Sequence, residues 1–244
     1  MDPTLFAAHS EPLADNIIAF VIVKNNESSY QESLKHIATM DIPNGYTVNI
    51  ITVINARSLA AAYNSAMCSS KARYKVYMHQ DVLLLNRFFL HDVIRIFSSN
   101  AFVGMIGVCG CSKLPPSGVW WEADVKYGKV LEYRGVFRDL SFSEVNNDVQ
   151  FVEAIDGLLM VTQYDLPWRE DLFNGFHFYD TSQCLEFRKA GLYVAIPRQM
   201  TPWCIHYKDE NYQLSINEYN TARMIFLSNY SYVTSNLQTI KTSI

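Results

Sequence analysis

The sequence predicts an α/β fold with a mainly parallel central sheet flanked by helices. Short apolar runs alternate, along the first half of the chain, with segments of helical period. Such alternation implies β–α–β units, which build parallel sheets. The hydrophobic share of 49% and the aromatic share of 14% among 244 residues can fill a large core. Because no internal repeat or linker-like segment is present, one domain over residues 1–244 is expected.

The first half of the chain is expected to hold four strands and three helices. Residues 16–23 (NIIAFVIV) form a continuous apolar run, typical of a strand buried on both faces. Ser29 and Glu32 predict a capping box that starts a helix ending near Thr39. The pattern then predicts strands at 47–54, 74–78 and 102–108, an alanine-rich helix within 55–72, and a helix that Asn86 begins.

The second half is less regular. A loop at residues 114–118 contains two prolines and a glycine and precedes Trp120 and Trp121. From there to about Asn147 the sequence is polar without a strong period. Beyond it we expect strands at 150–155, 158–163 and 192–196, a helix from Thr181 or Ser182 to Gly191, and a C-terminal helix at 215–234.

Composition restricts the partners and the location of the chain. A net charge of −4 argues against a nucleic-acid partner, which would need clustered Lys and Arg. No apolar run reaches the roughly 18 residues of a transmembrane segment. The N-terminus lacks the basic start of a signal peptide, and the five cysteines are expected to be reduced thiols. We therefore expect a cytoplasmic protein, either free or bound peripherally at the inner membrane face.

A polar triplet, His79-Gln80-Asp81, separates two apolar runs where a strand is expected to leave the core. Burying the Asp81 carboxylate ionised and unpaired would cost several kcal/mol, so a partner must meet it. A divalent metal ion is one such partner. The alternative is that Asp81 caps the following turn. These residues alone leave both interpretations open.

Polar side chains follow three successive predicted strands, at residues 24–27, 55–58 and 79–81. Ligands of parallel α/β sheets bind at this edge, the carboxyl ends of the strands. Ordinary polar loops are the alternative. The chain has no Gly-rich, Lys-containing phosphate loop and no Gly-rich dinucleotide turn. A phosphate ligand would therefore need a metal ion or side chains to hold it.

Two later segments carry side chains that suit catalysis. Asp180 follows the aromatic residues Phe176, Phe178 and Tyr179, which suit the apolar face of a sugar ring. Asp180 is either a general base with a raised pKa or the N-cap of the helix that follows. His206 follows another predicted strand, where a lone histidine is more often a hydrogen-bonded side chain than a metal ligand.

Taken in order, these segments resemble the GT-A glycosyltransferases, and most closely the bacterial glycosyltransferase-like branch of glycosyltransferase family two. The resemblance begins with a strand followed by Asn-Asn-Glu at 25–27, with Tyr63-Asn64, and with Tyr-Met-His-Gln-Asp-Val at 77–82. It continues with residues 114–121, residues 173–180, Gly191, Pro197, Trp203 and His206. In all it covers residues 17–207.

The resemblance implies a GT-A-like single domain with a nucleotide-binding half at about 16–110 and an acceptor and catalytic half at about 111–210. The triplet would replace the family's Asp-x-Asp metal motif, with His79 where the family has its first Asp. Asp81, His206 and His79 would then bind Mn²⁺ or Mg²⁺, and Asp180 would be the catalytic base. The implied nucleotide-sugar contacts are Val23, Asn26, Glu27, Asn55, Arg57, Asn64, Gln80 and Asp81. The implied acceptor contacts are Trp120, Trp121, Asp156, Gly157 and Tyr179.

The function that follows is transfer of a hexose-type sugar, with inversion and metal assistance, from a nucleoside diphosphate sugar of the UDP type. The acceptor would be a hydroxyl group of a glycan or of another molecule. One rival is a nucleotide-sugar-binding relative without activity, which the departure at His79 favours. The second is a sugar nucleotidyltransferase, whose Gly-rich loop after the first strand is missing at residues 24–27.

Overall fold

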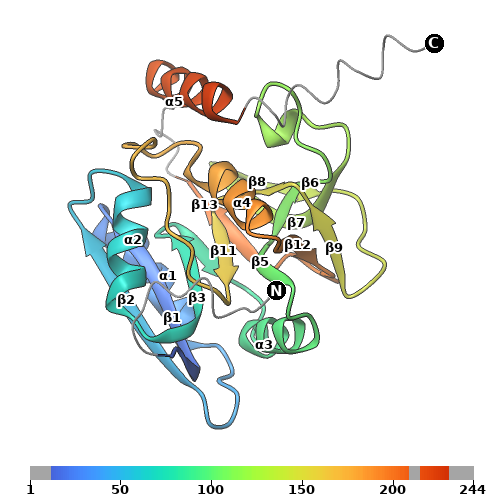
Figure 1. The fold of residues 1–244 in the computed structure, drawn as a ribbon. Helices are drawn as coiled ribbons and strands as arrows, with labels where there is room; N and C mark the ends of the chain where they lie inside the picture. Colours follow the sequence, from blue (N-terminus) through green and yellow to red (C-terminus); the bar gives the residue numbers. More distant parts are fainter. Residues whose placement is uncertain (1–11, 209–214, 231–244) are drawn as a thin grey trace.

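The computed structural model describes residues 12–208 and 215–230, and it contains two sheets that share one hydrophobic core (Figure 1). The central sheet has seven strands in the order β2-β1-β3-β11-β5-β12-β9. The second sheet has the order β10-β6-β7-β13-β4, and β8 pairs with β7. The strands are β1 (Ala14–Lys24), β2 (Thr47–Ile54), β3 (Ala72–His79), β4 (Val82–Leu84), β5 (Val103–Gly107), β6 (Cys109–Cys111), β7 (Lys126–Arg134), β8 (Val136–Ser141), β9 (Val149–Val152), β10 (Ala154–Ile155), β11 (Leu159–Thr162), β12 (Tyr193–Pro197) and β13 (Cys204–Tyr207). The helices are α1 (Glu27–Ala38), α2 (Leu59–Ser69), α3 (Phe89–Ser99), the 3₁₀ turn η2 (Trp120–Glu122), α4 (Tyr179–Lys189) and α5 (Ile216–Asn229).

The predicted α/β architecture is confirmed, and its first half is parallel. β1 lies between β2 and β3 and runs parallel to both. Its residues Ile18 to Ile22 are fully buried, as expected for a continuous apolar run. Because these three strands run the same way, the loops that follow β1 and β3 lie at one edge of the sheet.

The central sheet is mixed, because β11 runs antiparallel to its neighbours β3 and β5. The turn at Asp156-Gly157 precedes β11, whose first residue, Leu159, pairs with Met78 near the end of β3. The His79 N–H also donates to the Leu158 carbonyl oxygen at 3.0 Å. The start of β11 therefore brings Gly157 to the edge where β3 ends. A strand buried on both faces has the same apolar sequence in either direction, so the prediction missed this reversal.

A β-hairpin, β7 and β8, occupies the segment that was expected to lack regular structure. The two strands pair antiparallel, and Gly135 turns the chain between them at a φ of 74°. Five of the six β8 side chains are exposed, so β8 has no apolar alternation to reveal it. The available signal was Gly135 itself, which lies between the β-favouring residues Tyr133, Val136 and Phe137.

Two helices begin before their predicted starts. Asn26, not Ser29, is the N-cap of α1, and its side-chain oxygen accepts the Ser29 N–H at 3.0 Å. α4 begins at Tyr179, after Phe178 adopts the left-handed conformation with a φ of 59°. Asp180 therefore lies inside the first turn of α4, and the alternative interpretation of Asp180 as the N-cap is excluded.

Helices α2 and α3 both begin at other residues than predicted. Ser58 caps α2, so this helix begins after the predicted start at 55. Phe88 holds the N-cap position of α3, and Asn86 instead accepts the Phe88 N–H at its side-chain oxygen at 2.9 Å. Both helices still bury the apolar faces that were predicted from their periodicity.

Helix α5 lies across the end of the molecule, beside the start of α4 (Figure 1). The ring centroids of Tyr219 and Phe226 are 5.2 and 5.3 Å from that of Phe178. The Tyr230 hydroxyl, just after α5, donates to Glu186 Oε1 of α4 at 2.6 Å. Residues 231–234 of the predicted C-terminal helix lie outside the described residues. Among the described helices, none is long and apolar enough to cross a membrane.

Candidate functional site

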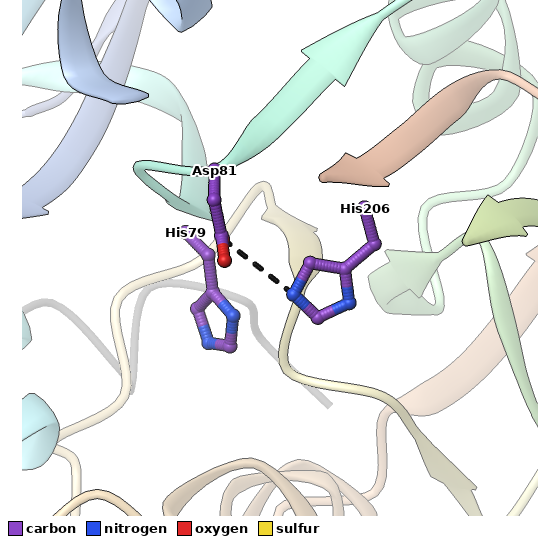
Figure 2. A group of neighbouring side chains, drawn as sticks. All are labelled: His79, Asp81 and His206. Atoms are coloured by element: carbon purple, nitrogen blue, oxygen red, sulfur yellow. Dashed lines mark ion pairs between the residues drawn. The ribbon is translucent and has the colours of Figure 1, made fainter. Parts of the chain in front are cut away.

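Three potential metal ligands meet where β3 ends. His79 is the last residue of β3 and Asp81 directly precedes β4, while β13 brings in His206 by pairing with β4 opposite Val82. One ligand atom from each of the three side chains lies within 4.8 Å of the others. His206 Nε2 is 3.5 Å from Asp81 Oδ1, as the dashed line in Figure 2 shows. We call these residues the His–Asp–His triad.

The surroundings of the triad favour the ligand forms of its side chains. Burial lowers the pKa of His79 to about 4, although the Asp81 charge opposes this shift. Burial would raise the pKa of Asp81, but His206 and His79 outweigh it and lower that pKa to about 2. At neutral pH His79 is therefore a neutral imidazole and Asp81 a carboxylate. Metal binding requires these protonation states.

The donor set of the triad fits a divalent cation. Imidazole nitrogens are ligands for transition metals, and carboxylate oxygens are ligands for Mn²⁺ and Mg²⁺ as well. The triad would leave further positions for oxygen atoms of a ligand, because divalent cations of this kind take more than three ligands. His79, which stands in place of the first Asp of the Asp-x-Asp motif, would therefore supply a nitrogen ligand where that motif supplies an oxygen ligand.

A hydrogen-bonded chain links the triad to Asp180. His79 Nε2 lies 2.7 Å from the Tyr179 hydroxyl, which donates to the Gly157 carbonyl oxygen at 3.2 Å. The Gly157 N–H in turn donates to Asp180 Oδ2 at 2.9 Å. A Cβ atom at position 157 would come within 2.2 Å of the Tyr179 hydroxyl oxygen, so this series of hydrogen bonds requires glycine at position 157.

Asp180 is a carboxyl group poised near neutrality. Burial and the nearby Asp156 charge raise its pKa to about 7, against the hydrogen bonds from Thr181 and Gly157. The Thr181 N–H donates to Asp180 Oδ1 at 2.8 Å and the Gly157 N–H to the other oxygen. Both oxygens are therefore oriented by backbone groups. A carboxyl group with this pKa can accept a proton at working pH.

Two cavities meet at the triad. The β1-side cavity, about 560 Å³, is lined by residues that include Val23, Asn26, Gln80 and Asp81. The β7-side cavity, about 540 Å³, is lined by residues that include Trp120, Trp121, Asp156, Tyr179 and Asp180. Five side chains line both cavities and form the wall between them: His79, Phe176, His177, His206 and Lys208.

The structure brings only some of the predicted nucleotide-sugar residues to the β1-side cavity. Gln80 lines it, but its side chain also accepts the N–H groups of Asn25 and Asn26 at 2.8 and 2.9 Å. Gln80 therefore holds the loop between β1 and α1 in place. Asn26 has its side-chain oxygen engaged as the cap of α1. Val23 and Asp81 complete the predicted residues that line this cavity.

Four other predicted nucleotide-sugar residues line neither cavity. Glu27 is bonded to Lys24 and to Gln31, both at 2.7 Å. Asn64 holds the backbone of Trp168 through two hydrogen bonds of 2.9 and 2.8 Å. Asn55, in a left-handed conformation after β2, and Arg57 are exposed.

The predicted acceptor residues gather at the β7-side cavity. Trp120 is buried and Trp121 is 49% exposed, and their rings meet edge to face with centroids 6.0 Å apart. Asp156 and Tyr179 line the same cavity, whereas Gly157 does not line it and donates its N–H to Asp180. The five residues come from three separate segments that the fold brings together.

Several residues of the two cavities were not predicted. His177 and Lys208 line both cavities. His177 directly follows Phe176, and Lys208 is two residues beyond His206. Tyr219 of α5 and Glu132 of β7 line the β7-side cavity. The C-terminal helix was predicted, but nothing in the sequence tells which site α5 covers.

Comparison with known proteins agrees with this geometry. Residues 19–230 match a family described as "Glycosyltransferase like family". The chain belongs to the glycosyltransferase-like family. A search of curated proteins gives no match.

The solved structures of TarS share the GT-A fold of this chain. S. aureus TarS 1-349 in complex with UDP-GlcNAc aligns over 91% of this chain and 71% of its own, with 11% identity and a TM-score of 0.56. A second TarS 1-349 structure aligns over 78% of this chain with 11% identity and a TM-score of 0.53. The mannosyltransferase PcManGT from Pyrobaculum calidifontis, in complex with GDP-Man and Mn²⁺, aligns over 80% with 15% identity and a TM-score of 0.49. The chain spans 60% of the length of each of the latter two.

Proposed function

We propose that the chain is an inverting glycosyltransferase that moves a hexosyl group from a nucleoside diphosphate sugar to an acceptor hydroxyl group. The observation that carries this proposal is the position of the His–Asp–His triad where two cavities meet. Its two histidines line both cavities, Asp81 lines only the β1-side cavity and Asp180 lines only the β7-side cavity. Membership of the glycosyltransferase-like family supports the class of reaction. The UDP-GlcNAc complex of TarS, which shares the fold, supports a donor of the UDP type.

The β1-side cavity would take the nucleoside diphosphate. Val23 and the ordered loop that Gln80 holds would contact the nucleoside, and Asp81, His79 and His206 would hold Mn²⁺ or Mg²⁺ at its inner end. A divalent cation bound there supplies positive charge that neutralises the departing diphosphate. His79 and His206 line both cavities, so this end of the diphosphate would face the acceptor.

The β7-side cavity would take the acceptor, a glycan or another molecule with a free hydroxyl group. Trp120 and Trp121 offer aromatic surface for a sugar ring. Asp180 would take the proton of the acceptor hydroxyl as its oxygen attacks the anomeric carbon and the bond to the diphosphate breaks. One displacement inverts the configuration at that carbon.

The Asp180→Asn variant tests the assignment of the base. Asn keeps the shape and can still accept one backbone N–H, but it cannot take the proton. Turnover should fall about 10²- to 10⁴-fold. Donor affinity, measured by calorimetry with UDP and Mn²⁺, should barely change because Asp180 does not line the β1-side cavity.

Asp171→Asn is a matched control, because Asp171 is an exposed carboxylate bonded to Arg169 outside both cavities. It should leave turnover unchanged. Near-normal turnover in Asp180→Asn would refute the base assignment. Loss of UDP binding in that variant would show that Asp180 has a structural role instead.

The same assays separate the two rival functions. Hydrolysis of a nucleotide sugar by the wild type, absent in Asp180→Asn, would argue against a binding protein without activity. Release of pyrophosphate from a nucleoside triphosphate and a sugar phosphate would favour a nucleotidyltransferase. Within this proposal the protein works in the cytoplasm, where nucleotide sugars are its donors, free or at the inner membrane face.

A further inference from the structure

We propose that Tyr179 is a positioning residue that holds His79 in the tautomer protonated at Nε2, so that the Nδ1 lone pair faces the cation site. This inference rests on the cation site of the proposed function. It adds a residue that touches neither the cation nor the donor and yet determines whether His79 can be a ligand.

The hydrogen bonds of the Tyr179 hydroxyl favour one tautomer of His79. The Gly157 carbonyl oxygen can only accept, and we assign the single proton of the Tyr179 hydroxyl to this bond, at 3.2 Å. The Tyr179 oxygen must then accept from His79 Nε2, at 2.7 Å. The opposite arrangement would leave the Gly157 carbonyl without this donor. His79 therefore carries its proton on Nε2 and has its lone pair on Nδ1.

The other ring nitrogen of His79 points to the triad. In Figure 2 the nitrogen next to the attachment of the ring lies on the side that faces His206. That nitrogen is Nδ1, and no other hydrogen-bond partner among the described residues occupies it in place of a cation. A proton on Nδ1 would instead point into the site and repel a cation.

The Tyr179 hydroxyl has little freedom to leave this position. Tyr179 is 4% exposed, and its ring packs against Tyr63 and Trp168 with centroids 5.8 and 6.2 Å away. On the other side the backbone of Gly157 approaches so closely that even a methyl group there would displace the hydroxyl. The bond to His79 is thus built into the packing of α4 against the turn before β11.

With its Nδ1 lone pair directed at the site, His79 can serve as a nitrogen ligand, and nitrogen ligands affect which cations bind. With two imidazoles and one carboxylate the triad suits Mn²⁺ and later transition metals, whereas Mg²⁺ prefers an all-oxygen shell. Partners that orient a ligating histidine typically account for about 10- to 100-fold in metal affinity. The Tyr179→Phe variant removes only the hydroxyl oxygen, so its loss in affinity measures this orientation.

The test uses the full chain with Mn²⁺ alone as the probe. Calorimetry should show Mn²⁺ binding about 10- to 100-fold weaker in Tyr179→Phe than in the wild type. Tyr230→Phe is the matched control, because it removes another buried hydroxyl that contacts α4, at Glu186, away from the triad. Its Mn²⁺ affinity should equal that of the wild type. Mg²⁺ should compete only weakly for the wild-type site.

The tautomer is read directly from long-range ¹H–¹⁵N spectra of the histidine rings without metal. The wild type should show the His79 proton on Nε2, and Tyr179→Phe should show a mixture of tautomers. A wild-type proton on Nδ1 overturns the inference even if Tyr179→Phe does not fold. Unchanged Mn²⁺ affinity in a folded Tyr179→Phe also overturns it. Failure of the wild type to bind Mn²⁺ overturns the cation site, whereas the role of Asp180 is tested separately by turnover.

Discussion

Two carboxylates near the wall between the cavities differ in pKa because their neighbours differ. His206 and His79 surround Asp81 and lower its pKa to about 2, despite its burial. Asp180 lies near the negatively charged Asp156, and burial raises its pKa to about 7. Neighbouring acids whose pKa values are pushed apart are suited to different tasks. Here one carboxylate stays ionised, while the other can exchange a proton at neutral pH.

The raised pKa of Asp180 predicts a pH-dependent stability difference. Folding raises this pKa from 3.8 to about 7, so its contribution to stability is full below pH 4 and is lost as pH rises through 7. Asp180→Asn does not undergo this loss. The free energy of unfolding of the variant, relative to wild type, should therefore rise between pH 5 and pH 8. Urea unfolding in EDTA at both pH values measures it, and a difference that does not change with pH would contradict the raised pKa.

The ion pair between Lys75 and Asp165 is the second residue-scale feature with a measurable consequence. Lys75 Nζ lies 2.8 Å from Asp165 Oδ2, and the side chains are 0% and 1% exposed. Lys75→Met would leave a buried carboxylate without this partner, which costs about 3–5 kcal/mol of unfolding free energy. The double variant with Asp165→Leu should lose less than the sum of the single variants in urea unfolding. Additive losses would show that the two charges do not stabilise each other.

At the scale of elements, α5 depends on close contact with the loop before η2. Gly118 has a φ of 73°, and a Cβ atom there would lie 2.8 Å from the Phe226 ring. The Arg223 side chain also donates to the Ser117 carbonyl oxygen at 2.8 Å. Helix α5 is thus held against the loop that carries Trp120 and Trp121.

Gly118→Ala should therefore loosen α5, while Gly45→Ala should not. Both glycines have positive φ values, so each substitution costs about 1–2 kcal/mol for the left-handed backbone. Only Gly118→Ala adds the collision with Phe226, since no atom lies within 4 Å of a Cβ atom at Gly45. Hydrogen exchange of residues 216–229 should accelerate in Gly118→Ala alone. Equal exchange in both variants would show that this contact does not hold α5.

The sequence predicts elements better than it predicts how they meet. Strand β1 and helix α3 can be predicted from short stretches of sequence, because a continuous apolar run and a helical spacing of apolar residues are both visible in consecutive residues. The direction of β11 depends on its neighbours in the sheet, and the exposed strand β8 has no apolar pattern, so neither could be predicted from consecutive residues. Asp81, Asp180 and His206 stood out as polar residues at the ends of apolar runs. The link through Tyr179 and Gly157 depends on tertiary packing and could not be predicted from their spacing.

At the scale of the whole molecule, ligand binding at the triad should stabilise the entire fold. The triad connects β3, β4 and β13, so a ligand that binds it binds only the folded chain. UDP with Mn²⁺ at a hundredfold excess over Kd should add about 2.7 kcal/mol to the free energy of unfolding. Asp81→Ala should lose the Mn²⁺-dependent part of the thermal shift. An equal shift in that variant would rule out Asp81 as a main ligand.

The distance along the chain between the triad residues also affects the order of events during synthesis. His79 and Asp81 leave the ribosome early, whereas His206 follows only after β5 to β12 have been made. The nascent chain can form the parallel unit of β1, β2 and β3 from local segments, but it cannot assemble the triad. Truncated chains that end before β13 should be unable to retain Mn²⁺. Acquisition of the ion would thus follow the addition of β13 to the fold.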